Sequence, residues 1–361
     1  MNSDGEARRH VTLTLLLVFS FAFVGCPGGS KQGPGANSAN TAPAPSPASS
    51  ATVASSPFDS ERALTLVRKQ VEFGPRPGGS AQLEQTRNFI IGELKSYGLK
   101  VSTDEFHPRT PLGAKKLVNI TAELPPSVPP SFIDTPSHNV IIISSHYDTK
   151  LFKKFRFVGA NDAGSSTAVL MELARVMATA KTDRRFTYWF VFFDGEESFC
   201  EEWEQCHNAN PADPKTPLPD NTYGSRRYVE QLENRNELSR VRAMILLDMI
   251  GYKDLNFGRD DLSSTWLLDI VWQTARELGY GSIFEDRIEG VGGDDHEPFL
   301  RAGIDALDII QLSNYRSPSG EEYWHTAGDT LDKISGKSLK IVGDVMLASL
   351  PKIEARLESK R

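Results

Sequence analysis

Short apolar segments alternate with helical patterns along most of the chain. Four apolar segments are rich in Val, Ile and Phe, at residues 140–143, 186–193, 244–247 and, more weakly, 306–310. This is typical of strands that are covered on both faces. Amphipathic helices are expected at residues 80–97, 165–177, 225–232 and 266–278. The alternation predicts an α/β fold in which a mostly parallel sheet carries helices on both faces.

The first 26 residues have the pattern of an export signal. Two arginines precede an apolar run at residues 11–24, which is too short to span a bilayer comfortably. Gly25 and Cys26 follow directly and resemble the end of a bacterial lipobox, so Cys26 is a candidate for lipidation. An ordinary cleaved signal with an incidental cysteine is the alternative.

Residues 27–57 form a second N-terminal segment. Pro, Ala, Ser and Gly supply 24 of its 31 residues, and it contains one charge and no aromatic side chain. Such a composition cannot bury enough apolar surface to offset the entropy of ordering, so a disordered tether is expected. Residues 58–361 are then a single globular domain, exported and anchored by lipid to the periplasmic or extracellular face of the cell envelope.

Composition and charge narrow the function further. The 361 residues include 47 acidic and 40 basic side chains, for a formal net charge of −7. Nucleic-acid binding, which depends on neutralising phosphates with Lys and Arg, is not expected.

Cys200 and Cys206 lie six residues apart in a chain expected to be exported. Both a disulfide across this short loop and two buried free thiols remain open.

Polar clusters follow three of the predicted strands at their carboxyl ends, which is where ligands bind in open α/β sheets. Further clusters occur at residues 159–164 and 324–326. Together they supply imidazoles and carboxylates, the nitrogen and oxygen ligands that suit Zn²⁺. These candidate ligands are His146, Asp162, Glu197, Asp248 and His325. Glu196 adjoins Glu197, so one carboxylate of the pair can bind a metal while its neighbour moves a proton.

Residues 294–297, Asp-Asp-His-Glu, have two interpretations. They form a solvated loop, or His296 competes as a metal ligand.

Taken together, these motifs resemble the animal-type glutaminyl-peptide cyclotransferases, or glutaminyl cyclases, of the zinc aminopeptidase superfamily. The resemblance extends in order from about Phe73 to Ile334. The segments that carry it are HYDTK (146–150), FVGA (157–160), FFDGEESF (192–199), YGSR (223–226), LLDMIG (246–251), DDHEPFL (294–300) and WHT (324–326).

The resemblance implies a site and a reaction. One zinc ion would be bound, and the N-terminal glutamine of a peptide would be closed to pyroglutamate with release of ammonia. The matching positions are Asp162, Glu197 and His325 as zinc ligands, Glu196 as the acid/base, Asp248 and Asp294 as assisting carboxylates, and Trp203 and Trp324 as pocket walls. A monomer that acts on peptides with N-terminal glutamine is expected.

Two alternatives remain. Residues 161–166 are more similar to the aminopeptidase motif, and His146 with Asp248 would complete a dinuclear zinc site of an aminopeptidase. The insertion at residues 199–221, with Trp203, favours the cyclase. A non-catalytic peptide-binding lipoprotein would be favoured by loss of Glu196 or of a ligand, and neither is lost.

Overall fold

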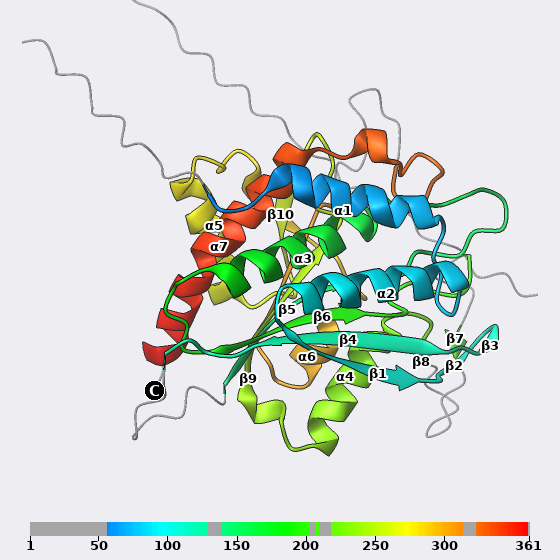
Figure 1. The fold of residues 1–361 in the computed structure, drawn as a ribbon, viewed down its shortest axis with the longest axis horizontal. Helices are drawn as coiled ribbons and strands as arrows, with labels where there is room; N and C mark the ends of the chain where they lie inside the picture. Colours follow the sequence, from blue (N-terminus) through cyan, green and yellow to red (C-terminus); the bar gives the residue numbers. More distant parts are fainter. Residues whose placement is uncertain (1–55, 129–138, 202–206, 209–217, 313–322, 360–361) are drawn as a thin grey trace, which may run out of the picture. The chain divides into compact units, whose positions relative to one another are not determined.

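A six-stranded sheet forms the centre of the computed structural model, which describes residues 56–128, 139–201, 207–208, 218–312 and 323–359 (Figure 1). Parallel pairing joins β5 to β6 and β9, and β9 to β12, whereas β4 lies antiparallel to β6 and β1 antiparallel to β4. In spatial order the strands are β1 (Lys100–Phe106), β4 (Leu117–Leu124), β6 (Thr187–Phe193), β5 (Val140–His146), β9 (Val241–Asp248) and β12 (Ala306–Ile310).

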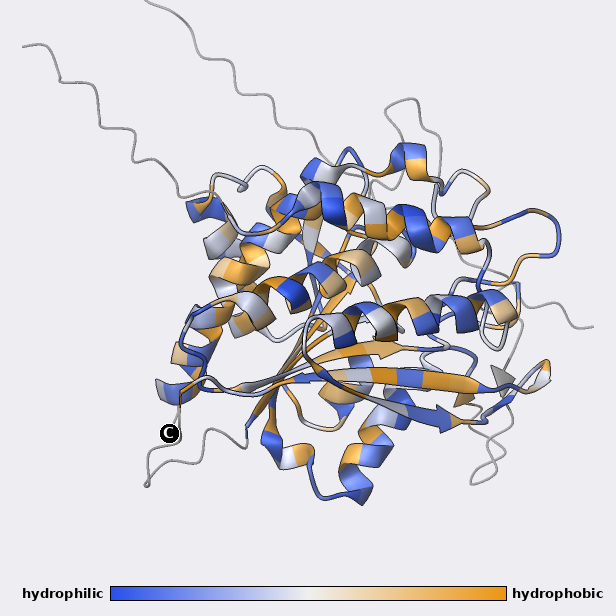
Figure 2. Ribbon diagram, viewed as in Figure 1, coloured by the Kyte–Doolittle hydropathy of each residue, from blue (hydrophilic) through white to orange (hydrophobic). Residues whose placement is uncertain are grey.

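Helices cover both faces of this sheet (Figure 1). Ile141 and Ile143 pack with one set of helices, whereas Val140 and Ile142 pack with the other, because successive side chains of a strand point to opposite faces. The first set is α1 (Ser60–Phe73), α2 (Ala81–Ser96), α3 (Gly164–Thr179), α5 (Thr265–Glu277) and α7 (Gly336–Ser359). The second set is α4 (Tyr223–Asn234) and α6 (Glu297–Arg301). Figure 2 shows apolar residues along the central strands and mixed polarity on the helices.

Smaller elements complete the described part of the chain. They are β2 (Arg109–Thr110), β3 (Gly113–Ala114), β7 (His207–Asn208), β8 (Leu218–Pro219), β10 (Phe257–Asp260), β11 (Phe284–Glu289), η3 (Leu238–Arg240) and η4 (Leu331–Lys333). The described residues belong to one compact unit, Ser55–Arg361. No helix among them is both long and apolar enough to cross a membrane.

The predicted α/β class is confirmed, and the four predicted strands are β5, β6, β9 and β12. The helix expected at residues 80–97 is α2, and the Ser80 hydroxyl accepts a hydrogen bond from the backbone N–H of Leu83 at 3.1 Å. The antiparallel strands β1 and β4 were not predicted. Polar residues interrupt the apolar pattern of β4, because Asn119, Thr121 and Glu123 alternate with apolar ones.

The N-terminal predictions concern residues that the structure does not describe, apart from residues 56 and 57. The signal segment, the tether and the lipidation of Cys26 therefore stay predictions.

One close contact joins the start of the described chain to α7. The ring of Phe58 lies so near Gly343 that a Cβ atom built there would stand 2.2 Å from ring carbon Cδ2. Phe58 is buried, so its ring cannot swing into solvent. In contrast, Gly92 of α2 is exposed, and a Cβ atom there would meet nothing within 4 Å.

We predict opposite effects of the same substitution at these two helix positions. Gly92→Ala should stabilise the protein by up to about 1 kcal/mol, the usual gain in helix propensity. Gly343→Ala should destabilise it, because overpacking costs about 1–3 kcal/mol and exceeds that gain. Urea unfolding followed by circular dichroism measures both, and equal shifts for the two variants would contradict the packing.

Candidate active site

The candidate site lies at the carboxyl edge of the parallel strands. His146 ends β5, Asp248 ends β9, and Glu196 and Glu197 follow β6. Asp162 comes directly before α3. All five side chains are buried, which is costly for charged groups unless they have partners. The strand ends therefore bring together the polar clusters that the sequence places there.

Asp162, Glu197 and His325 form the first cluster. The Nε2 atom of His325 is 3.4 Å from Oδ2 of Asp162 and 3.3 Å from Oε1 of Glu197. The second oxygen of Glu197, Oε2, is buried and has no hydrogen-bond partner among the described residues. One ligand atom from each residue lies within 4.8 Å of the others. Two carboxylates and one imidazole, with a buried oxygen left over, fit the donor set of a catalytic zinc ion.

His146, Asp162 and Asp248 form a second cluster. The Nε2 atom of His146 is 3.2 Å from Oδ1 of Asp162 and 3.2 Å from Oδ1 of Asp248. Asp162 belongs to both clusters, with one oxygen toward His146 and the other toward His325. The structure therefore assembles the donors of the one-metal site and those of the two-metal site around one shared carboxylate.

Asp148 supports both clusters from behind. Its two carboxylate oxygens accept hydrogen bonds from the backbone N–H groups of Glu196, at 3.2 Å, and Glu197, at 3.3 Å. The Oδ1 atom also lies 3.4 Å from Nδ1 of His146. A carboxylate at this nitrogen fixes the orientation of a metal-binding imidazole. Asp148 lies within the HYDTK motif, but no role was predicted for it, because its contacts depend on the pairing of β5 with β6.

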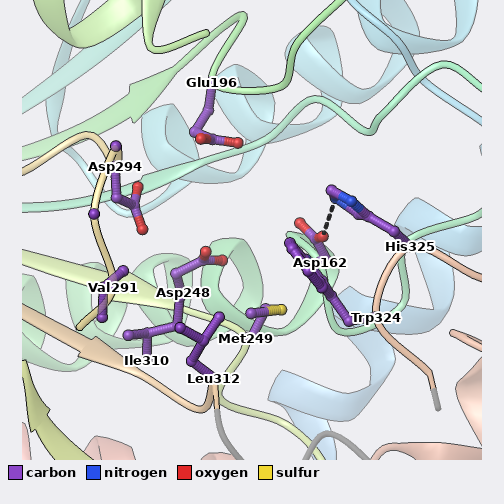
Figure 3. Close-up of a pocket in the computed structure, with 12 residues that line it drawn as sticks. Asp162, Glu196, Asp248, Met249, Val291, Asp294, Ile310, Leu312, Trp324 and His325 are labelled. Carbon is purple, nitrogen blue, oxygen red and sulfur yellow. Dashed lines mark ion pairs between the residues drawn. The ribbon is translucent and has the colours of Figure 1, made fainter. Parts of the chain in front are cut away.

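A cavity of about 460 Å³ opens beside these clusters. In Figure 3 the carboxylates of Glu196, Asp248 and Asp294 point into one shared space, with Trp324 and His325 on its other side. Its remaining lining includes apolar or small residues that sequence reasoning did not single out, namely Met249, Val291, Gly292, Gly293, Ile310 and Leu312. Met249 directly follows β9 and Ile310 ends β12, so their places at the carboxyl ends of strands were the available signals.

Burial gives two carboxyl groups of the cavity unusual acidities. It raises the pKa of Glu196 well above its usual range, and the charges of Glu197, Asp294 and Asp295 raise it further, whereas His146 lowers it. Burial also raises the pKa of Asp248 to about 7, against the opposing effect of His146. A carboxyl group with a raised pKa can both hold and release a proton near neutral pH, as general acid/base catalysis requires.

The pKa of the His325 imidazole is raised, as expected for a group that is cationic when protonated and lies among carboxylates. Burial lowers its pKa, but Glu197 and Asp162 outweigh burial and raise the pKa to about 9. Without a metal ion His325 therefore carries a proton at neutral pH. A metal ion that binds its Nε2 atom has to displace that proton.

The two predicted aromatic walls have different outcomes. Trp324 lines the cavity, and its ring stacks on that of His325 with centroids 4.3 Å apart and planes 22° apart. Trp203 lies outside the described residues, so its role stays a prediction.

Cys200 is disulfide-bonded, which removes the free-thiol alternative for this residue. Cys206 also lies outside the described residues.

The solvated-loop interpretation of residues 294–297 is wrong for their first three members. Asp294, Asp295 and His296 are buried. The Nε2 atom of His296 is 3.2 Å from Oδ2 of Asp260, and Nδ1 is 3.7 Å from Oδ2 of Asp308. His296 thus lies with Asp294 and Asp308 in a third group of possible metal donors, separate from the two clusters that contain Asp162.

The fold and the site define an α/β protein with a carboxylate and histidine centre at the carboxyl edge of its sheet. Residues 119–350 match the sequence model of Peptidase family M28. A solved glutaminyl cyclase from an Acidobacteriales bacterium has 33% sequence identity and a TM-score of 0.71, with 88% of this chain and 100% of that chain covered. The chain therefore belongs to Peptidase family M28 and, within it, to the glutaminyl cyclases.

More distant relatives are named for two different activities. The glutaminyl-peptide cyclotransferase of Drosophila melanogaster is 26% identical over 283 residues, which are 72% of each chain. A Zn-dependent exopeptidase from Parabacteroides distasonis is 26% identical with a TM-score of 0.66, covering 80% of this chain and 97% of that chain. The resemblance found in the sequence is thereby confirmed, and zinc is the metal that the comparisons support.

Proposed function

We propose that the protein is a zinc-dependent glutaminyl-peptide cyclotransferase, which converts the N-terminal glutamine of peptides to pyroglutamate and releases ammonia. One observation carries the proposal. Glu196, a buried carboxyl group with a raised pKa, faces the same cavity as the donors Asp162 and His325. The similarity to solved glutaminyl cyclases supports the same reaction.

In this proposal Asp162, Glu197 and His325 hold one zinc ion and leave a coordination position open for the substrate. Zinc, when bound, supplies a Lewis acid that polarises the carbonyl of the glutamine side-chain amide. His146 and Asp248 remain paired with each other at 3.2 Å and serve as supports.

Glu196 moves the proton. As a carboxylate it accepts a proton from the α-amino group of the substrate, whose nitrogen forms a bond to the side-chain amide carbon. Glu196 then returns the proton to the amide nitrogen, the bond from that nitrogen to carbon breaks, and ammonia leaves. Asp248 and Asp294 point into the same space as Glu196 and assist this transfer, and Trp324 forms a wall against the substrate (Figure 3). No water nucleophile takes part.

A dinuclear zinc aminopeptidase is the second candidate. The observation that favours it is the cluster of His146, Asp162 and Asp248, which supplies a second group of metal donors around the same Asp162. The similarity to the Zn-dependent exopeptidase points in the same direction. A non-catalytic peptide-binding protein is not favoured, because Glu196 and every donor are present and assembled.

Two peptides distinguish the enzymatic candidates. We expect a peptide that begins with glutamine to release ammonia. Its mass should fall by that of one ammonia molecule, while its number of residues stays the same. A peptide that begins with leucine should remain intact under the same conditions. Mass spectrometry and an ammonia assay measure both. Released leucine would instead establish the aminopeptidase.

Substitutions within the Glu196 and Glu197 pair test their different roles. Glu196→Gln should keep one zinc ion per chain and lose about 10²–10⁴-fold in kcat, because glutamine cannot carry the proton. Glu197→Gln should bind zinc more weakly, because a neutral amide replaces an anionic ligand. Elemental analysis and turnover measure the two effects. If Glu196→Gln lost zinc and Glu197→Gln kept it, the roles within the pair would be reversed. Two zinc ions per chain in the fully active wild type would favour the aminopeptidase.

We further propose that the protein is exported and held at the cell envelope by lipid on Cys26, with residues 27–57 as a tether. The two N-terminal arginines, the apolar run and the Gly–Cys pair support this proposal. The membrane is then contacted through the anchor alone, and the enzyme works as a monomer on peptides outside the cytoplasm.

Two changes near the N-terminus test the anchor. Cys26→Ser should move the protein from the membrane fraction of a bacterial host to the soluble fraction, because the lipid attachment atom is lost. Deletion of residues 1–57 should give a soluble protein with unchanged turnover, because the tether contributes no core. Cell fractionation and the glutamine-peptide assay measure these outcomes. A deletion variant that fails to fold would show that the domain begins earlier.

A further inference from the structure

Asp329 lies four residues after His325, but its carboxylate binds the segment that carries Asp162. Its Oδ1 atom accepts a hydrogen bond from the backbone N–H of Asn161 at 2.8 Å, and Oδ2 accepts one from the N–H of Asp162 at 3.1 Å. The backbone carbonyl of Asp329 also accepts from the N–H of Ala160 at 3.4 Å. Asp329 is 1% exposed, so these bonds form away from water. Two segments with proposed zinc ligands are joined by this one residue.

The turn that contains His325 needs such support. His325 has φ of 53°, in the left-handed region that side chains other than glycine rarely adopt. Holding a residue there costs free energy, which surrounding contacts must supply. Within the turn, the N–H of Asp329 donates to the carbonyl of Thr326 at 3.3 Å, and the N–H of Gly328 donates to the Thr326 hydroxyl at 3.1 Å. The position of His325 is therefore coupled to that of Asp329.

Arg76 holds the carbonyl groups just before Asn161. Its guanidinium donates to the carbonyl oxygens of Val158, at 2.6 Å, and Gly159, at 2.9 Å. Arg76 is fully buried, and burial lowers its pKa to about 10, whereas the nearby charge of Asp329 favours the protonated guanidinium. Residues 158–162 thus have carbonyl oxygens bound by the buried guanidinium of Arg76 and N–H groups bound by the buried carboxyl group of Asp329. Such a segment cannot shift without breaking several buried hydrogen bonds.

Asn161 extends the connection to a third segment. Its Oδ1 atom accepts a hydrogen bond from the backbone N–H of Gly251 at 2.7 Å, three residues after Asp248. A Cβ atom at Gly251 would stand 2.6 Å from Cβ of Ser165, so the two segments approach closely. The segments that carry Asp162, His325 and Asp248 therefore meet at Asn161 and Asp329.

We propose that Asp329 is a positioning residue, which holds Asp162 and His325 at the separation that a shared zinc ion requires. Its own oxygens bind backbone N–H groups, so it acts on the ion only through the two ligands. The inference rests on the proposed metal centre. Supporting groups of this kind commonly contribute about 10–100-fold to metal affinity.

The test compares Asp329→Asn with Asp332→Asn. Asp332 lies in the same segment, but its carboxylate is 65% exposed and accepts hydrogen bonds from the Thr330 hydroxyl and the Lys333 ammonium group, so it is a matched control. An asparagine at 329 places an N–H₂ group against a backbone N–H group and loses one acceptor. We expect Asp329→Asn to bind zinc about 10–100-fold more weakly in competition with a chromophoric chelator.

Two further readouts separate positioning from general destabilisation. The visible spectrum of the Co²⁺-loaded protein should change in Asp329→Asn, because ligand geometry sets it, and should stay the same in Asp332→Asn. The unfolding temperature of each metal-free variant shows whether it is folded when zinc is added. Zinc affinity within twofold of wild type, with an unchanged Co²⁺ spectrum, would overturn the proposal.

A measurement on the wild-type chain covers the case in which Asp329→Asn does not fold. The amide hydrogens of Asn161 and Asp162 should exchange with solvent more slowly than those of exposed loops, because Asp329 accepts both. Fast exchange at both amides would contradict the proposal. If wild type bound no zinc at all, the proposed metal centre would be wrong. If wild type bound zinc and a folded Asp329→Asn variant bound it equally well, only the positioning role would be wrong.

Discussion

The shared carboxylate of Asp162 is the constraint on which the rest of the site depends. One oxygen faces His146 at 3.2 Å and the other faces His325 at 3.4 Å. Burial would raise the pKa of Asp162, but the two imidazoles outweigh burial and lower it, so the carboxylate stays ionised. Removing one partner of such a buried ionic group is strongly destabilising. The segments around Asp162 are accordingly bonded on both sides, by Arg76 and by Asp329.

The sheet supplies the geometry that this carboxylate needs. Parallel pairing of β5 with β6 and β9 places His146, the Glu196 and Glu197 pair, and Asp248 at one edge. Asp148 then links the end of β5 to the segment after β6 through the N–H groups of both glutamates. The two adjacent glutamates therefore face different surroundings. Glu197 points to the metal donors, whereas Glu196, with its raised pKa, faces the cavity.

The structure assembles possible donors for one metal ion and for two, so the donors by themselves do not distinguish a cyclase from an aminopeptidase. In both, a buried carboxyl group moves a proton beside a Lewis acid. What differs is the attacking group: the substrate's own amine in one reaction, and water in the other. The lining of the cavity therefore matters more for function than the ligand set. Trp324, stacked on His325, and the apolar residues around Val291 and Leu312 give this cavity walls against which a side chain can pack.

The sequence by itself determined the fold class and the strands β5, β6, β9 and β12, because these depend on local apolar patterns. It also determined the polar residues at the strand ends, because the carboxyl ends of parallel strands lie at one edge of a sheet. Its motifs also indicated the family. Only the tertiary structure decided the antiparallel edge, the burial of His296 and the hydrogen bonds of Asp148, Arg76 and Asp329. Asp329 and the N–H group of Asp162 are 167 residues apart in the chain. No local pattern encodes a contact over that separation, since it exists only after the sheet and its loops have packed.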